Sequence, residues 1–277
     1  MNKMNKWNNL YRDRKGRPRL RKSVVAFIDL LGYTADVLSA QSKGKDAEYL
    51  IRLRKAFDSS LPQLASYLPT RAPKWWLNTF TDNVVLGFPL FMSEDEGILQ
   101  VVTRGLSVFQ LYMTLDGFFM RGGVAIGDVY FDEDIVFGPA LIEAYEVESR
   151  LARDPRIVLG KSCTKYLSTQ IFDNTFDLLK DTDDQVFLNY LNRIIWYDIY
   201  DEEVSKSNQK QPDFLTQHKL LVESKLKKYS PQPSVWAKYN WVARYHNFFC
   251  RECAELPETY FVDVFKIEFG PQRIKSK

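Results

Sequence analysis

Apolar positions fall into short β-branched and aromatic runs separated by longer stretches with helical spacing. Residues 23–31, written SVVAFIDLL, form an apolar run that contains one carboxylate and precedes Gly32. This pattern predicts a short buried strand that ends at the glycine. Apolar residues at helical spacing over 34–61, interrupted by the polar stretch Gln41–Asp46, predict helical structure after the strand.

A hairpin is predicted next along the chain. Trp75–Phe80 and Val84–Phe88 are apolar runs, and the turn-like residues Thr81, Asp82 and Asn83 separate them. The predicted hairpin therefore carries a carboxylate at a polar tip within an apolar context.

Further elements follow up to residue 160. The spacing predicts a long helix over 94–119, strands over 124–131, 135–137 and 156–160, and a helix from about Pro139 to Arg153. Strands and helices in this order indicate an α+β fold, in which helices cover a mixed or antiparallel sheet.

The character of the sequence changes at about residue 175. Residues 185–199 suit a strand and a helix, and 201–213 are polar and resemble a linker. Two helices are predicted over 214–228 and 233–254, and the alternation in Tyr260–Phe269 predicts a final strand. We expect these elements to complete the fold.

Charge is distributed unevenly along the 277 residues. The formal net charge is +3, but residues 1–22 hold nine basic residues and one aspartate, which leaves 29 basic and 34 acidic residues elsewhere. The Asn-rich leader is typical of a solvated, poorly ordered terminus. The alternative is that its basic residues bind nucleic acid or an anionic membrane. We therefore divide the chain into a flexible leader at 1–22, a core domain at 23–175 and a C-terminal extension at 176–277.

The rest of the composition favours a cytoplasmic protein. No apolar run has signal-peptide spacing or the length of a membrane span, and three cysteines are too few for a secreted disulfide framework. His246, Cys250 and Cys253 share a face of a predicted helix, which suits three metal ligands. The aromatic residues around them favour ordinary buried thiols instead.

Two carboxylates stand in apolar strands, where a charge is costly unless a cation or several donors compensate it. Asp29 lies at the end of the first predicted strand, and Asp82 lies at the tip of the predicted hairpin. If these strands are neighbours, the carboxylates meet at one edge of the sheet. Such hard oxygen ligands suit Mg²⁺ or Mn²⁺, and two of these ions can act on a transferring phosphoryl group.

Four segments carry a resemblance to a known family. Phe27–Tyr33 (FIDLLGY) and Phe80–Asn83 (FTDN) resemble the two aspartate motifs of class III nucleotidyl cyclases. Arg121–Gly127 and Val136–Glu148 look like that family's fourth strand and the following strand-to-helix segment. The residues in these segments are more similar to those of the bacterial pyrimidine cyclases of the Pycsar anti-phage system than to those of purine cyclases. The resemblance covers about residues 23–165 and implies a ferredoxin-like cyclase core.

Departures from the purine cyclase pattern support this choice. Where adenylate cyclases carry a base-reading Lys and Asp, this chain has Asn78 and Ile135, so adenine recognition is disfavoured. Trp75 and Trp76 either fill space beside a smaller base or belong to the core. The family's transition-state Asn and Arg align with Ile142 and Glu146, so another cation must replace them or activity is weak. The candidates are Arg121, Arg150, Arg153 and Lys161.

The resemblance also implies a mechanism. Asp29, Asp82 and the Leu30 carbonyl would hold two divalent ions, Mn²⁺ or Mg²⁺, and Arg121 would assist catalysis. The backbone N–H groups of Leu31, Gly32 and Tyr33 would cradle the phosphates of the nucleoside triphosphate. Asn78 or Asn83 would contact the pyrimidine of UTP or CTP.

The implied product is a 3′,5′-cyclic pyrimidine nucleotide that activates a separately encoded effector, and the implied assembly is a homodimer with composite sites. UTP is favoured over CTP by the resemblance alone. Two rival interpretations stay open: a polymerase palm or metal nuclease with a basic nucleic-acid arm, and a non-catalytic cyclase-like module that binds nucleotide or a partner.

Overall fold

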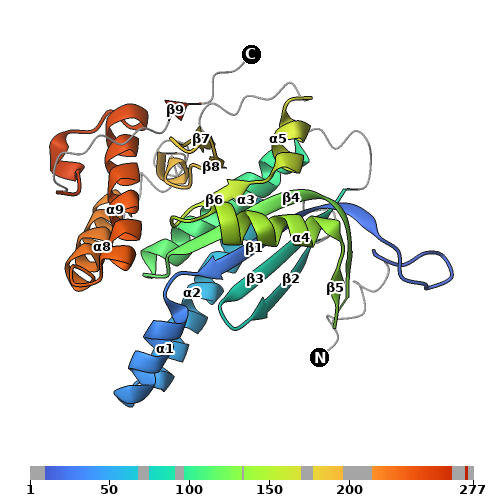
Figure 1. The fold of residues 1–277 in the computed structure, drawn as a ribbon, viewed down its shortest axis with the longest axis horizontal. Helices are drawn as coiled ribbons and strands as arrows, with labels where there is room; N and C mark the ends of the chain where they lie inside the picture. The colour runs from blue at the N-terminus through green and yellow to red at the C-terminus, as the bar shows by residue number, and fades with distance from the viewer. Residues whose placement is uncertain are drawn as a thin grey trace, which may run out of the picture.

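The computed structural model describes residues 10–67, 75–90, 97–132, 134–169, 177–195, 214–263 and 272–273. Its described strands form one sheet in the order β2-β3-β1-β4-β6-β8-β7-β9, and β5 pairs with β4 outside this path. Figure 1 shows the sheet at the centre of the molecule with helices on both of its faces.

The first four strands have a ferredoxin-like arrangement. They are β1 (Arg21–Leu30), β2 (Trp76–Phe80), β3 (Asn83–Pro89) and β4 (Met120–Phe131), and neighbouring strands among them are antiparallel. Two helices, α1 (Tyr33–Ser42) and α2 (Asp46–Ser66), connect β1 to β2, and α3 (Ile98–Leu115) connects β3 to β4. Chain order βαββαβ and sheet order 2-3-1-4 define this motif. The α+β prediction is therefore confirmed.

Helices α2 and α3 cover one face of these strands. Ile28 and Leu86 from that face share a core with Leu64 of α2 and Phe109 of α3. Helix α3 is the one described helix with the length and hydropathy of a membrane span, and 72% of it is buried inside the fold.

Helix α4 (Pro139–Glu146) covers the opposite face, as Figure 1 shows. Its alanines Ala140 and Ala144 pack against Val25 and Ala125 of the sheet. The approach is close at Gly123, where an added Cβ would lie 2.1 Å from the Ala144 carbonyl oxygen.

Strand β4 begins at Met120 rather than at residue 124 as predicted. The Arg121-Gly122-Gly123 segment therefore lies inside this strand.

Helix α4 does not continue as an α-helix to Arg153. A π-helical turn, Val147–Leu151, follows it. The chain then forms β6 (Ile157–Leu159), which is parallel to β4, and the short helix α5 (Lys161–Leu167). A short strand, β5 (Val136–Phe137), pairs with the end of β4.

The sheet continues across residue 175, the predicted domain boundary. Strand β8 (Val186–Leu188) pairs with β6, β7 (Leu178–Lys180) pairs with β8, and β9 (Gln272–Arg273) pairs with β7. Two helices, α8 (Phe214–Lys228) and α9 (Pro233–Phe248), pack beside this end of the sheet, and a π-helical turn, Phe249–Cys253, extends α9.

The prediction of a final strand from Tyr260 is wrong in its described part. Glu258–Tyr260 form a 3₁₀ turn, and the carbonyl of Tyr260 bonds to His246 rather than to a neighbouring strand. The rest of that prediction, residues 264–269, lies outside the described residues, as does the predicted linker at 201–213.

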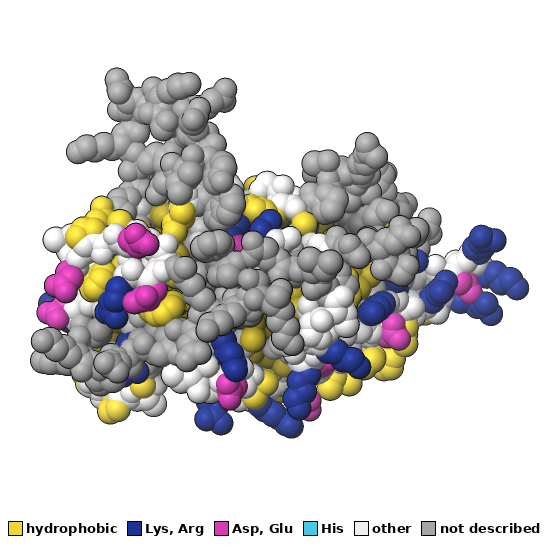
Figure 2. Space-filling view, turned by 90° about the horizontal axis from the view of Figure 1, so that it is seen from above, with side chains coloured by type: hydrophobic (Ala, Val, Ile, Leu, Met, Phe, Trp, Pro, Cys, Tyr) yellow, Lys and Arg dark blue, Asp and Glu magenta, His cyan; other side chains and the backbone are white. Residues whose placement is uncertain are grey.

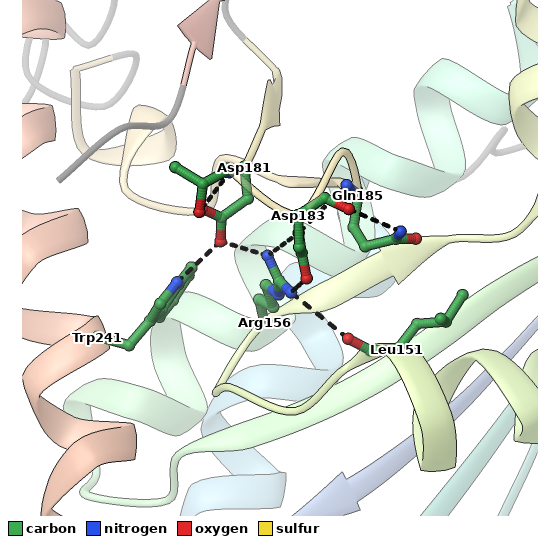
Figure 3. Close-up of polar contacts among 7 residues, drawn as sticks. Leu151, Arg156, Asp181, Asp183, Gln185 and Trp241 are labelled. Atoms are coloured by element: carbon green, nitrogen blue, oxygen red, sulfur yellow. Dashed lines mark hydrogen bonds and ion pairs between the residues drawn. The ribbon is translucent and has the colours of Figure 1, made fainter.

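Buried ion pairs hold the second half of the sheet to its helices. Arg156, whose side chain is 1% exposed, contacts the carboxylates of Asp181 and Asp183, and its Nη2 lies 3.4 Å from the Leu151 carbonyl (Figure 3). Trp241 of α9 donates from Nε1 to Asp181 at 2.9 Å. The network therefore links α9 to the loop between β7 and β8.

Residues 10–22 differ from the solvated arm expected of the leader. Tyr11 is 3% exposed, packs edge-on against Phe131, and lies 3.0 Å from the Ser23 hydroxyl. Arg12 lies 3.6 Å from Asp132. A bridge between Arg12 and Pro18 closes a short hairpin in this segment, and its exposed basic side chains gather on the projection at the right of Figure 2. The aromatic anchor Tyr11 was not recognised in the sequence because only Leu10 beside it is apolar and the surrounding residues are mostly polar.

Candidate active site

The structure brings Asp29 and Asp82 together. Strands β1 and β3 pair with Asp29 opposite Asn83, and the Leu30 N–H donates to the Asp82 carbonyl at 3.0 Å. The two carboxyl groups are close enough for the charge of Asp82 to raise the pKa of Asp29. The predicted convergence at one sheet edge is therefore observed.

The hairpin tip holds Asp82 in a fixed orientation. Thr81 adopts a positive φ of 56°, which is unusual for a β-branched residue. Its hydroxyl donates to Oδ1 of Asp82 at 2.7 Å, and Nδ2 of Asn83 donates to the same oxygen at 3.2 Å. Both donors therefore engage one carboxylate oxygen of Asp82.

Arg121 lies opposite Asp29 on β4 and connects it to a third carboxylate. Its Nε donates to Oδ2 of Asp29 at 2.9 Å, and its Nη2 lies 2.9 Å from Oε1 of Glu148. The Glu148 side chain is 4% exposed, whereas that of Asp29 is 17% exposed. Arg121 is therefore engaged by two carboxylates within the chain, and its part in catalysis stays a prediction.

The cluster has an excess of negative charge. Burial raises the pKa of Asp29; the hydrogen bond and charge of Arg121 oppose this rise, and the charge of Asp82 adds to it. Burial also raises the pKa of Glu148, although Arg121 and Lys238 of α9 oppose this change. One guanidinium thus lies among three carboxylates, and a further cation would stabilise their charged forms.

The sequence analysis missed Glu148, although a signal was present. Ala140, Ala144 and Glu148 follow each other at intervals of four, and all three are buried. A glutamate at the end of a row of buried alanines on one helix face marks a carboxylate that points into the fold. The π-helical turn that contains Glu148 leaves no comparable mark in the sequence.

The expected phosphate loop is present only in part. The Leu31 N–H donates to the Phe119 carbonyl at 2.8 Å, so it does not face a phosphate as predicted. Gly32 has φ 80°, which favours glycine, and helix α1 begins at Tyr33. The first N–H groups of a helix have no intrahelical acceptor, so Tyr33 keeps its predicted place as an anion donor.

The residues proposed to contact a base lie near the hairpin. Asn78 is exposed on β2 and pairs in register with Val85, which places it on the same sheet face as Asn83. Trp75 stacks on Phe88, with ring centroids 6.3 Å apart, and Trp76 stacks on Phe131 at 4.7 Å. Both tryptophans are packed against the core.

The alternative cations are exposed. Arg150 lies in the π-helical turn, Arg153 follows it, and Lys161 begins α5. Ile142 is 62% exposed, and the side chain of Glu146, 50% exposed, lies 3.7 Å from Arg150. The side chains of these five residues are exposed, and no contact within the described residues joins any of them to Asp29 or Asp82.

The donor set fits a divalent ion that is shared with a substrate. Asp29, Asp82 and the Leu30 carbonyl supply hard oxygens at one edge, and Mg²⁺ is commonly held by one or two carboxylates together with substrate phosphates. Among the described residues no group of three His, Cys, Asp or Glu side chains forms a complete protein cage. Substrate oxygens would therefore have to complete the coordination.

The His246 and Cys250 pair belongs to a buried hydrogen-bond chain. His246 lies 2.9 Å from the Tyr260 carbonyl through Nε2, and its Nδ1 lies 3.0 Å from Nδ1 of His218. Tyr190 contacts His218 Nε2 at 2.8 Å. A carbonyl only accepts, so neutral rings satisfy the chain when Tyr190 donates to His218, His218 to His246, and His246 to the carbonyl. These contacts support the structural interpretation of the helix.

Comparison with solved structures found 37 matching chains, whereas the two sequence comparisons found none. No protein-family model matches the chain, and no curated protein sequence matches it. A solved structure of the adenylyl cyclase CyaB from P. aeruginosa matches with a TM-score of 0.44 and 13% sequence identity. The match covers 61% of this chain and 94% of that chain.

Proposed function

We propose that the protein is a pyrimidine nucleotide cyclase that converts UTP to 3′,5′-cyclic UMP and diphosphate. The observation that carries this proposal is the meeting of Asp29 and Asp82 at the end of β1 and the tip of the β2–β3 hairpin. The FIDLLGY and FTDN motifs that contain them resemble those of class III nucleotidyl cyclases.

In the proposed reaction, different residues bind the metal ions, position the phosphates and orient the carboxylates. Asp29, Asp82 and the Leu30 carbonyl would hold two Mg²⁺ or Mn²⁺ ions. When bound, these ions supply charge stabilisation at the departing diphosphate and favour ionisation of the ribose 3′-hydroxyl. Gly32 and the Tyr33 N–H would position the phosphates. Arg121 sets the orientation of Asp29 and Glu148, which makes it a positioning residue.

A homodimer with composite sites is part of the proposal. Large apolar side chains are exposed on α4, on β5 and at the hairpin tip, among them Phe80 (76%), Phe137 (64%) and Ile142 (62%). The register of β2 places Phe80 on the sheet face that α4 covers. A second chain on this face would cover these side chains and bring its own groups to the Asp29 edge.

UTP is favoured over CTP by the resemblance to Pycsar cyclases, and CTP is the alternative. Asn78 and Asn83 can satisfy either base, because an amide offers both a donor and an acceptor. The same resemblance supports second-messenger synthesis in the cytoplasm during anti-phage defence, with a separately encoded effector.

The test is a product assay. Purified protein is incubated with Mn²⁺ and each of ATP, GTP, CTP and UTP, and the products are separated by chromatography. Cyclic UMP is expected, and Asp82→Ala should reduce its rate at least about 100-fold. Asp58→Ala is the matched control, because Asp58 is an exposed carboxylate paired with Arg54 on α2. Absence of any cyclic product would contradict the proposal.

A non-catalytic nucleotide-binding module is the second candidate. The observation in its favour is that Arg121 is engaged by Asp29 and Glu148, while Ile142 and Glu146 stand where the family has its transition-state Asn and Arg. This candidate predicts that UTP or CTP binds in the presence of Mg²⁺ and is recovered unchanged.

A further inference from the structure

A basic cleft lies between the first two helices and α8. It has a volume of about 410 Å³, and its lining comes from α1, from α2 and from the C-terminal half of α8. The charged residues of the lining are Asp36, Lys43, Lys45, Glu48, Arg52, Lys225 and Lys228. Five cations thus face two carboxylates, and the cleft has a net positive charge.

The two carboxylates already have partners. Lys228 lies 3.2 Å from Asp36, and Lys45 lies 3.5 Å from Glu48. No ion pair within the described part of the chain involves Lys43, Arg52 or Lys225. The positive charge of the cleft is therefore concentrated on these three residues.

Aromatic rings support two of these cations. The Lys225 ammonium lies 5.9 Å from the ring centroid of Phe119 and 5.7 Å from that of Tyr239. The Arg52 guanidinium lies 4.9 Å from the ring centroid of Phe118 and 5.4 Å from that of Tyr49. Such contacts reduce the freedom of long side chains and present their charged ends in defined places.

The surroundings of Lys225 disfavour its charged form, which a bound anion would stabilise. Burial lowers its pKa, and the charges of Lys228 and Arg52 lower it further, while Asp36 opposes this effect. A partly buried ammonium beside two other cations is unfavourable unless an anion neutralises it.

We propose that this cleft binds a small multivalent oxyanion of the phosphate class, either inorganic or carried by an organic phosphate. The cleft has the volume of a small-molecule site. Its walls come from the ferredoxin-like half through α1 and α2 and from the C-terminal half through α8. A bound anion would therefore bridge the two halves. None of the residues that line the cleft belongs to the Asp29 cluster, and the site needs no divalent ion.

The test uses inorganic diphosphate as the probe and calorimetry on the full chain at low salt in EDTA. Wild-type protein should bind the probe, and Lys225→Met should weaken binding at least about 10-fold, because it removes the central cation while keeping the contact with the rings. Arg52→Gln, on the opposite wall, should weaken binding similarly. Lys227→Met is the matched control, because Lys227 is exposed on α8 and does not line the cleft.

Further arms separate the sources of the anion and the two sites. Adenosine diphosphate that binds as well as inorganic diphosphate, with the same dependence on Lys225, supports recognition of the phosphates alone. Asp29→Asn should leave binding intact, which keeps this result independent of the proposed cyclase activity. The proposal is overturned if wild-type protein binds neither probe, or if Lys225→Met and Arg52→Gln, both folded by circular dichroism, bind as wild type does.

Discussion

The two halves of the sheet bury carboxylates in different ways. In the C-terminal half, Asp181 accepts from Arg156, from the Trp241 indole and from the Thr182 N–H. At the edge of the ferredoxin-like half, Asp29 accepts from Arg121 and lies beside the acceptor groups of Asp82. Several donors surround the first carboxylate, whereas the second has one guanidinium donor, which it shares with Glu148, and lies beside Asp82. The comparison distinguishes an ion network that stabilises the fold from one that has room for a further cation.

The largest effect is expected from breaking the donor-rich network. Arg156→Met leaves Asp181 buried without its main counter-charge, and the free energy of unfolding should fall by about 3–5 kcal/mol. Urea unfolding followed by circular dichroism measures this loss. Arg150→Met is the control, because the Arg150 side chain is 74% exposed and its loss should cost under about 0.5 kcal/mol. Equal losses in the two variants would contradict the comparison.

An intermediate effect is expected at the Asp29 edge. Arg121→Met removes the guanidinium that, among the described residues, contacts both Asp29 and Glu148, and stability in EDTA should fall by about 2 kcal/mol. Millimolar Mg²⁺ should restore more of the stability of this variant than it adds to wild type, because a divalent ion can neutralise the same carboxylates. Thermal unfolding with and without Mg²⁺ measures the difference, and an equal response of both proteins would argue against a cation site.

A smaller effect concerns Asp154, which lies beside the Arg156 network. Burial raises its pKa to about 6, and the charges of Asp181 and Asp183 add to this rise while Arg156 and Lys238 oppose it. The folded state therefore binds the proton more tightly than the unfolded chain, so this group lowers the free energy of unfolding as pH rises from about 4 to about 6. Asp154→Asn should gain about 1–2 kcal/mol over wild type at pH 7.5. Urea unfolding at pH 7.5 and at pH 4 should show this gain only at the higher pH.

The smallest effect is expected from Lys238, whose charge reaches both Glu148 and Asp154. Burial raises the pKa of each carboxyl group, and Lys238 limits the rise. Lys238→Met should therefore cost about 0.5 kcal/mol at pH 8, where both groups are charged, and almost nothing at pH 4. A loss of the same size at both pH values would mean that the side chain acts through packing.

The central strands and the meeting of two aspartates could be predicted from the sequence. A carboxylate is conspicuous in SVVAFIDLL and in a hairpin tip, because apolar strands rarely carry one. Strand neighbours and hydrogen-bond partners were not accessible in the same way. That Leu31 donates to Phe119, and that Arg121 faces Asp29, depends on pairing between segments about 90 residues apart.

Other features were missed for local reasons. Tyr260–Phe269 alternates like a strand, but Tyr260 ends a 3₁₀ turn whose carbonyl is fixed by His246. The charge run at the N-terminus suggested solvation, whereas the single ring of Tyr11 anchors residues 10–22 to β4. In both places tertiary contacts override the local pattern.

The missing side chain at Gly123 sets the distance between α4 and the sheet. A methyl group there would collide with the Ala144 carbonyl and with the backbone nitrogen of Glu148. Any larger residue would lift the helix and withdraw the Glu148 carboxylate from Arg121. The close packing of α4 therefore requires a residue without a side chain at position 123. In a library of all twenty residues at this position, we expect glycine alone to preserve the cluster.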